Sequence, residues 1–267
     1  MGKLHGRFRT AEWTTRQPHG GQTGPSSRPR WRARHCQPPG QPVGFAAMFR
    51  LVLFDIDGTL IRTGGAGVRA FGSVFEEVFG HSTGTEKIHF AGRTDSSLVR
   101  EMLENHNMAA TRENIDRFFA RYERWLRHWL TELGGHICPG VEVFMQHCVE
   151  RSSPPVIGLL TGNVRAGARI KLEHFGIWER FAMGAFGDDH EDRNELAVIA
   201  WQRGREHLGN GLGAEEILVV GDTPRDVACA RHIGAKVVGV TTGGATRDEL
   251  AATKPDWLVN DLSELSW

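Results

Sequence analysis

Two aspartates stand one residue apart at the end of an apolar run, in the octet LFDIDGTL at residues 53–60. We expect this run to be a strand, in which side chains two positions apart point to the same face, so Asp55 and Asp57 would repel each other. A metal ion between the two carboxylates would offset that repulsion. The alternative is that Asp57 and Gly58 form a turn that closes the strand while Asp55 is a solvated edge residue.

Two further apolar runs are followed by polar residues. The run 156–160 leads into TGN at 161–163, and the run 217–220 leads into GDTPRD at 221–226. Ligands of open α/β sheets bind at the carboxyl ends of the strands. Three strands are therefore predicted to deliver polar groups, including two pairs of acids, to one edge of a sheet.

Phosphoryl transfer is the chemistry that fits these acids. Asp55, Asp222 and Asp226 supply the hard oxygen ligands that Mg²⁺ prefers. A carboxylate can attack phosphorus to form an aspartyl phosphate, and a second carboxyl can protonate the leaving oxygen and then activate water. Asp55 and Asp57 have the spacing for these two roles.

Hydrogen-bond donors for the phosphoryl oxygens follow the same strands. Because these oxygens carry negative charge, they attract hydroxyl and amide donors. We expect the Thr161 hydroxyl, the backbone amides near Gly162 and the Thr59 hydroxyl to contribute. Gly58 and Asn163 complete the predicted substrate-binding residues at this edge.

The segments DIDGT, LLTGN and VVGDTPRD resemble three of the four motifs of the haloacid dehalogenase-like (HAD) hydrolase superfamily, in the family's order. The resemblance covers residues 50 to about 260. It implies that Asp55 is the nucleophile, that Asp57 is the general acid/base and reaches Mg²⁺ through its backbone carbonyl, and that Thr161 binds the phosphoryl group. It also implies that Asp222 and Asp226 complete the metal site. Dehalogenases and phosphonatases of the family carry a different residue in place of Asp57, so phosphatase or phosphomutase chemistry is implied.

The remaining family motif is a cation, usually lysine, that pairs with the nucleophile and the phosphate. No lysine occurs between Phe181 and Ile217. Arg193, in DDHEDRNELAVIA, is our predicted substitute, since an arginine fork can clamp a carboxylate and a phosphate together. One alternative is that Arg193 pairs only with the acids of its own loop. The other is that Lys171, in the preceding helix pattern, supplies the cation.

Apolar runs that alternate with helical patterns position these residues. Runs that are apolar on both faces are typical of a buried parallel sheet, and their alternation with helices predicts a doubly wound, mainly parallel, Rossmann-like α/β fold. The predicted strands are 51–56, 156–160, 217–220, 236–240 and 257–259. Between these strands, helices are predicted at 141–150, 164–175, 194–207, 224–232 and 247–252.

Between Gly64 and Gly140 we find no convincing strand but helix patterns at 68–79, 96–105 and 113–130. We predict an α/β core in residues 48–65 and 138–267 and an inserted all-helical cap in residues 66–137; the alternative is that these helices simply cover one face of the sheet.

AGRTD at 91–95 resembles the cap motif of the phosphoglycolate phosphatase and β-phosphoglucomutase-like branch. Arg93 in it could bind an anionic group of the substrate, or be an ordinary surface arginine. GAGVRA at 65–70 matches a dinucleotide fingerprint, but it lies too far from the strand, and we interpret it as a hinge and helix start.

The first 47 residues differ from the rest. They hold eight Lys or Arg and one acid, are rich in Gly, Pro, Gln and Arg, and carry few apolar residues, which predicts a disordered basic extension. It could be an arm for nucleic acid or another acidic partner, a weak targeting peptide, or an extension outside the functional protein. We favour the last, because Met48 directly precedes the first strand.

The chain shows no membrane-length apolar run and no secretory signal, and its four cysteines are widely spaced, which favours a reducing cytoplasm. We predict Mg²⁺-dependent hydrolysis of a small phosphorylated metabolite by a monomer or homodimer. The alternatives are a phosphomutase of the same superfamily and a non-catalytic binder of a phosphate ligand. Contact with nucleic acid is not expected.

Overall fold

The computed structural model describes residues 49–82, 84–209 and 211–265. The predicted N-terminal extension, residues 1–47, and the proposed start at Met48 lie outside the described residues. No helix in the described part of the chain is long and apolar enough to cross a membrane.

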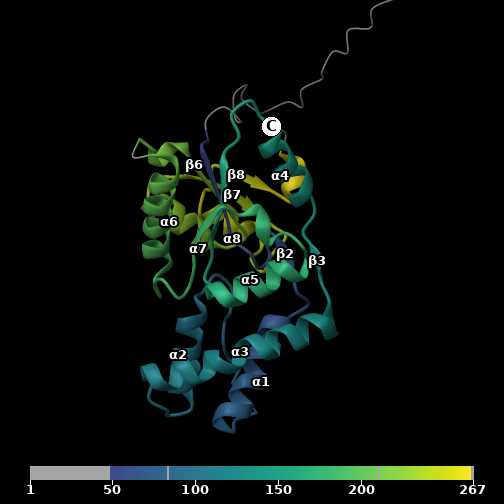
Figure 1. The fold of residues 1–267 in the computed structure, drawn as a ribbon, viewed down its shortest axis with the longest axis vertical. Coiled ribbons are helices and arrows are strands. Elements are labelled where there is room, and N and C mark those ends of the chain that lie inside the picture. The colour runs from purple at the N-terminus through teal and green to yellow at the C-terminus, as the bar shows by residue number, and fades with distance from the viewer. Residues whose placement is uncertain (1–48, 83, 210, 266–267) are drawn as a thin grey trace, which may run out of the picture. The chain divides into compact units, whose positions relative to one another are not determined.

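A six-stranded sheet, parallel throughout, forms the centre of the fold (Figure 1). Its order is β5-β4-β1-β6-β7-β8, so β1 lies between β4 and β6. The strands are β1 (Leu51–Phe54), β4 (Val156–Leu160), β5 (Met183–Ala185), β6 (Ile217–Gly221), β7 (Lys236–Val240) and β8 (Trp257–Val259). The predicted fold class is confirmed. We did not predict β5, whose three residues are too few to show a pattern.

Two apolar cores cover the two faces of the sheet, because successive side chains of β1 point to opposite sides. Val52 and Phe54 belong to one core, and Leu51 and Leu53 belong to the other. The first core is completed by α4 (Val141–Val149) and α5 (Arg165–His174). The second is completed by α6 (Arg193–Leu208), α7 (Pro224–His232) and α8 (Arg247–Ala252). All five helices start and end within two residues of their predicted bounds.

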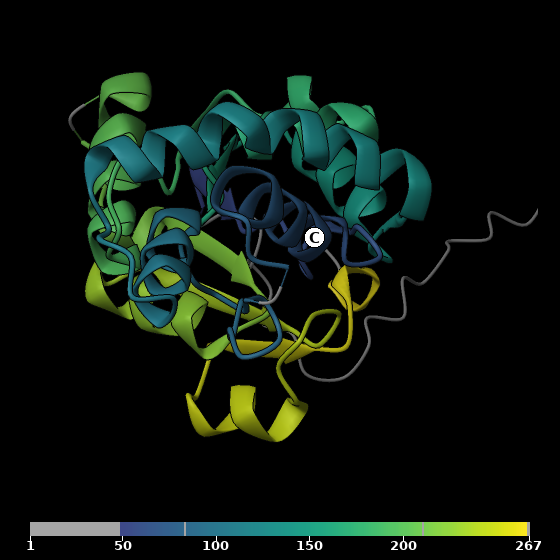
Figure 2. The same cartoon turned by 90° about the horizontal axis from the view of Figure 1, so that it is seen from below.

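The helices α1 (Ala66–Phe79), α2 (Asp95–Asn105) and α3 (Arg112–Leu133) pack side by side (Figures 1 and 2). They share a third apolar core built on aromatic residues such as Phe71, Phe118 and Tyr122, to which Ile170 of α5 and Val164, directly before α5, are added. This arrangement supports the predicted cap, but the division into a core of residues 48–65 and 138–267 and a cap of residues 66–137 stays a prediction.

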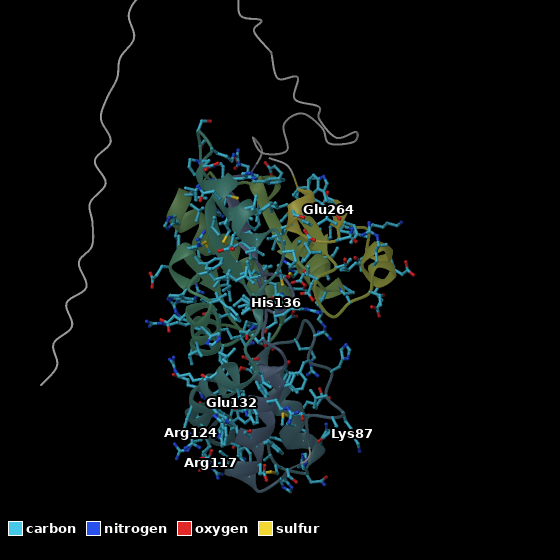
Figure 3. The ribbon with its side chains drawn as sticks, turned by 90° about the vertical axis from the view of Figure 1, so that its right-hand side faces the viewer. Lys87, Arg117, Arg124, Glu132, His136 and Glu264 are labelled. Carbon is cyan, nitrogen blue, oxygen red and sulfur yellow. The ribbon has the colours of Figure 1, made fainter. Side chains whose placement is uncertain are left out.

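The chain enters and leaves these helices through a short antiparallel ribbon of β2 (Ile61–Arg62) and β3 (His136–Ile137). His136, labelled in Figure 3, lies between the sheet and the three helices. The prediction that residues 64–140 contain no strand is therefore wrong at β3. A strand of two residues forms by pairing with a distant segment, and no local pattern announces it.

Gly135 next to this ribbon is required by its neighbours. Its φ is +137°, and an added Cβ would lie 2.1 Å from the backbone oxygen of Arg62. We predict that Gly135→Ala lowers the free energy of unfolding by about 3 kcal/mol or more. Gly80, which ends α1 with φ +76° and has open space around it, is the matched control, for which about 1 kcal/mol is expected. Urea unfolding measures both; equal losses would contradict the close approach.

Candidate active site

The carboxyl end of β1 brings Asp55 against a buried cation. Asp55 directly follows the strand, and its backbone N–H donates to the Val220 oxygen of β6 over 3.0 Å. Arg193, at the start of α6, places its Nη2 atom 2.9 Å from Asp55 Oδ1 and also contacts Asp226 Oδ1. All three side chains are buried. The alternative in which Arg193 pairs only with acids of its own loop is therefore not what the structure shows.

Burial and charge act in opposite directions on this ion pair. Burial raises the pKa of Asp55 from 3.8 to about 6, although the Arg193 guanidinium beside it lowers that pKa. Burial alone would lower the pKa of Arg193, but the carboxylates of Asp226 and Asp55 raise it above its ordinary value. Arg193 is therefore a permanent cation that offsets part of the cost of burying two carboxylates.

Asp222 adds a third buried carboxylate to the same edge. One carboxylate oxygen from each of Asp55, Asp222 and Asp226 lies within 4.8 Å of the others. Asp222 accepts hydrogen bonds from the Thr59 hydroxyl at Oδ1 (3.2 Å) and from the Gly244 N–H at Oδ2 (3.1 Å). Burial raises the pKa of Asp222 well above its ordinary value, and the neighbouring carboxylates raise it further.

A divalent cation fits this set of donors. Three buried carboxylates face a single guanidinium, so a hard cation such as Mg²⁺ would offset the remaining negative charge. Both carboxylate oxygens of Asp226 already have protein partners. Its Oδ1 contacts Arg193, and its Oδ2 accepts from the backbone N–H (2.9 Å) and the hydroxyl (2.7 Å) of Thr223, which caps α7. Asp55 and Asp222 therefore offer more accessible ligand atoms than Asp226.

Asp57 faces a second cation, Lys171, which we had considered only as a rival of Arg193. The Lys171 Nζ atom lies 2.6 Å from Asp57 Oδ2 and 2.6 Å from Asn163 Oδ1. The Asn163 side-chain amide in turn donates to Asp57 Oδ2 (2.8 Å) and to the Thr161 hydroxyl (2.9 Å). Lys171 follows Asn163 by eight residues, about two helical turns. Asn163 precedes α5, however, so this spacing alone does not point to Lys171.

The expectation that Asp55 and Asp57 share one face of a strand is wrong. We predicted the strand to reach Ile56, but β1 ends at Phe54, so both aspartates lie beyond it. Their carboxylates go to different cations, Asp55 to Arg193 and Asp57 to Lys171. The repulsion that the sequence suggested is thus offset by two separate ion pairs, to which a metal ion would add.

The loop before α2 packs onto the segment that follows β4. The Asp95 N–H donates to the Gly162 oxygen (2.8 Å), and Asp95 Oδ2 accepts from the Val164 N–H (2.9 Å). An added Cβ on Gly162 would lie 2.1 Å from the Arg93 backbone oxygen, so only glycine permits this approach. The Arg93 side chain pairs with Glu101 and donates to the Ser97 oxygen (3.2 Å).

A cavity of about 800 Å³ joins these groups. Of the predicted site residues, those that line it are Asp55, Asp57, Gly58, Arg93, Gly162, Asn163, Arg193 and Asp222. Thr59, Thr161 and Asp226 lie behind this lining and contact it through hydrogen bonds. Lys171 and Asp95 also line the cavity and were missing from the predicted site. Gly58 adopts φ +86°, and an added Cβ would lie 2.5 Å from Asp222 Oδ2.

Comparisons with known proteins identify a family and relatives that this chain resembles. A family model described as "Haloacid dehalogenase-like hydrolase" matches residues 52–240. Among curated relatives, the "Probable phosphatase IndB" of Dickeya dadantii is 28% identical over 221 residues, which cover 80% of this chain and 91% of the relative. A "Phosphoglycolate phosphatase" of Photorhabdus laumondii is 26% identical over 225 residues, 81% of this chain and 90% of the relative.

Among solved structures, CbbY from Rhodobacter sphaeroides in complex with phosphate superposes with a TM-score of 0.63. The match covers 82% of this chain and 97% of CbbY, at 18% sequence identity. At this identity the likeness concerns the fold.

Asp95 makes the stability of the protein depend on pH. Burial raises its pKa from 3.8 to about 7, while Lys171 and the Val164 N–H lower it. The folded protein then holds this proton more tightly than the unfolded chain, so stability falls as the pH rises from about 4 to about 7. We predict that Asp95→Asn removes this part of the fall, at most about 4 kcal/mol.

Urea unfolding in EDTA at pH 4.5 and pH 8 measures the effect. The variant should gain stability relative to the wild type between the two pH values. Asp116→Asn, which removes a solvent-exposed carboxylate of α3, is the control and should follow the wild type. A difference between Asp95→Asn and the wild type that is the same at both pH values would contradict the raised pKa.

Proposed function

The chain belongs to the haloacid dehalogenase-like hydrolase family, and from this premise we propose that it hydrolyses a small phosphomonoester with Mg²⁺, through an aspartyl phosphate on Asp55. The observation that carries the proposal is the buried Asp55 carboxylate, which lies at a strand end beside Arg193 and close to Asp222 in a cavity that also holds Asp57. The phosphatase names of the relatives support the same reaction class.

In the proposed first step, an Asp55 oxygen attacks phosphorus and the bond to the leaving oxygen breaks. Asp57 gives its proton to that oxygen. In the second step, Asp57 takes a proton from a water molecule that attacks the aspartyl phosphate, which releases phosphate and restores Asp55. Asp55, Asp222 and the Asp57 backbone carbonyl, with Asp226 in support, would hold Mg²⁺, and the bound ion would supply positive charge next to the phosphoryl group.

The two cations have different proposed roles. Arg193 is fixed by Asp226 and Asp55, so its guanidinium can balance charge at the attacked phosphoryl group. Lys171 holds the Asp57 carboxylate together with Asn163 and thereby positions the proton donor. This assigns the family's usual lysine role to Arg193 and gives Lys171 a separate one.

The remaining site residues have supporting roles in the proposal. The Thr161 hydroxyl and the Gly162 amide bind phosphoryl oxygens, and Thr59 orients Asp222 through its 3.2 Å hydrogen bond. Arg93, released from Glu101, would bind an anionic leaving group. Three buried cysteines without disulfides, Cys138, Cys148 and Cys229, support the proposed cytoplasmic location.

Hydrolysis of p-nitrophenyl phosphate tests the proposed function. We predict turnover that needs Mg²⁺, stops in EDTA, and falls by about 10³-fold or more in Asp55→Asn. The exposed Asp116→Asn variant should keep wild-type activity. Rapid acid quenching with a ³²P-labelled substrate should trap a phosphoenzyme in the wild type but not in Asp55→Asn.

Each failure has its own meaning. Metal-dependent turnover that survives Asp55→Asn would contradict the assigned nucleophile. A trapped phosphoenzyme without release of phosphate would favour the phosphomutase. Binding of phosphate without either signal would favour a non-catalytic binder.

The proposed role of Lys171 predicts a dependence on the leaving group. Lys171→Met should reduce kcat/KM, which reports the step in which the leaving group departs, by about 10-fold to 100-fold for an alkyl phosphate, whose leaving oxygen needs the proton from Asp57. The loss for p-nitrophenyl phosphate should be smaller, because nitrophenolate leaves without protonation. Equal losses for both substrates would show that Lys171 supports only the fold.

A further inference from the structure

Tyr122, the single tyrosine of the chain, has a hydroxyl without a protein partner. The residue lies in α3 and is 1% exposed. Among the described residues its hydroxyl is one of three buried side-chain polar atoms that make no hydrogen bond. An unsatisfied buried hydroxyl costs free energy and calls for an explanation.

The ring of Tyr122 is held rigidly, so the position of its hydroxyl is fixed. It packs edge-on against Phe71 of α1, with ring centroids 5.1 Å apart, and stacks near Phe118, one turn earlier in α3. On the side of α5 it touches Gly167, where an added Cβ would lie 2.9 Å from a ring carbon. Contacts with α1, with α5 and within α3 thus hold the ring in place.

Tyr122 lines the catalytic cavity together with Asp57 and Asp95. Tyr122 borders two hollows, this cavity and a second one of about 490 Å³ between α2, α3 and residues 187–191. After burial, the carboxylates of Asp95 and Asp57 are the groups that raise the pKa of Tyr122. Both line the catalytic cavity and neither lines the second hollow.

The surroundings of the hydroxyl define what could bind it. The cavity lining contributed by residues 67–98 includes the apolar side chains of Phe71, Phe90 and Leu98, whereas the strand ends contribute acids such as Asp55 and Asp222. A phosphomonoester bound over Asp55 would extend its leaving group toward the lining from residues 67–98. Tyr122 would offer this part of the lining an uncharged hydroxyl, in addition to the charged side chains of Arg93 and Asp95.

We propose that the Tyr122 hydroxyl binds an oxygen of the leaving group, so that the enzyme selects phosphomonoesters whose leaving group carries a hydroxyl or carbonyl oxygen. This inference rests on the proposed function. A substrate without that oxygen leaves the hydroxyl unpaired and is rejected, because a site built for a hydrogen bond discriminates strongly against an analogue that lacks it.

The single tyrosine allows a direct test that does not need turnover. Protein labelled with ¹³C at Tyr ζ gives one NMR signal. We would titrate it, with Mg²⁺ present, with non-hydrolysable ligands in matched pairs: 2-hydroxyethyl- and 3-hydroxypropylphosphonate against ethyl- and propylphosphonate. A hydroxylated ligand should shift the signal, and its alkyl counterpart should not.

Tyr122→Phe removes only the hydroxyl. Calorimetry should show about tenfold weaker binding of the hydroxylated phosphonate and unchanged binding of the alkyl one. Without ligand, the variant should unfold at the same temperature as the wild type or higher, because the hydroxyl makes no bond there. Phe118→Leu is the matched control: it perturbs the same aromatic core but lines neither hollow, so it should lower stability and keep the affinity ratio.

Three outcomes would overturn the inference or its premise. If both members of a pair bind and shift the signal equally, or if Tyr122→Phe keeps the affinity ratio, the hydroxyl holds a buried water and selects nothing. If inorganic phosphate binds but no hydroxylated ligand gains affinity from Tyr122, the inference fails while the proposed function stands. If neither phosphate nor any phosphonate binds, the proposed function fails, and this inference with it.

Discussion

The cost of burying carboxylates at the end of a parallel sheet governs this structure. Asp55, Asp222 and Asp226 lie at one edge with almost no access to water, and a carboxylate in such a place must find a positive or hydrogen-bonding partner. Arg193 supplies the charge and the N-terminal end of α7 supplies donors for Asp226. The connections after β1, β5 and β6 are therefore tied to one another through charge as well as through the sheet.

Much of the fold could be predicted because its strands are apolar on both faces. Such runs can be recognised in the sequence without knowing which strands lie next to them. The segments that escaped prediction form only through pairing with distant residues. β5 has three residues, and β2 and β3 have two each, so their stability comes from tertiary contacts. The prediction also placed the end of β1 two residues too late. It therefore did not show that Asp55 and Asp57 pair with different cations.

The residues of the candidate site differ in the same way in how far they could be predicted. The residues at strand ends could be predicted because the topology of an α/β sheet determines where they gather. Lys171 could not be, since its role depends on how α5 lies against the turn after β1. The structure gives each aspartate of the opening octet its own cation, a pairing that spacing along the chain does not specify.

The carboxylate of Asp226 belongs at once to the start of a helix and to the centre of the site. A natural variant at this position would therefore lose folded protein and specific activity together. In a survey of variants that measures only growth or total activity, this variant would be scored as catalytically impaired. A measurement of protein abundance in the cell would show that much of the lost activity reflects a smaller amount of folded protein. Selection on this motif thus acts on how much enzyme exists as well as on how fast each molecule works.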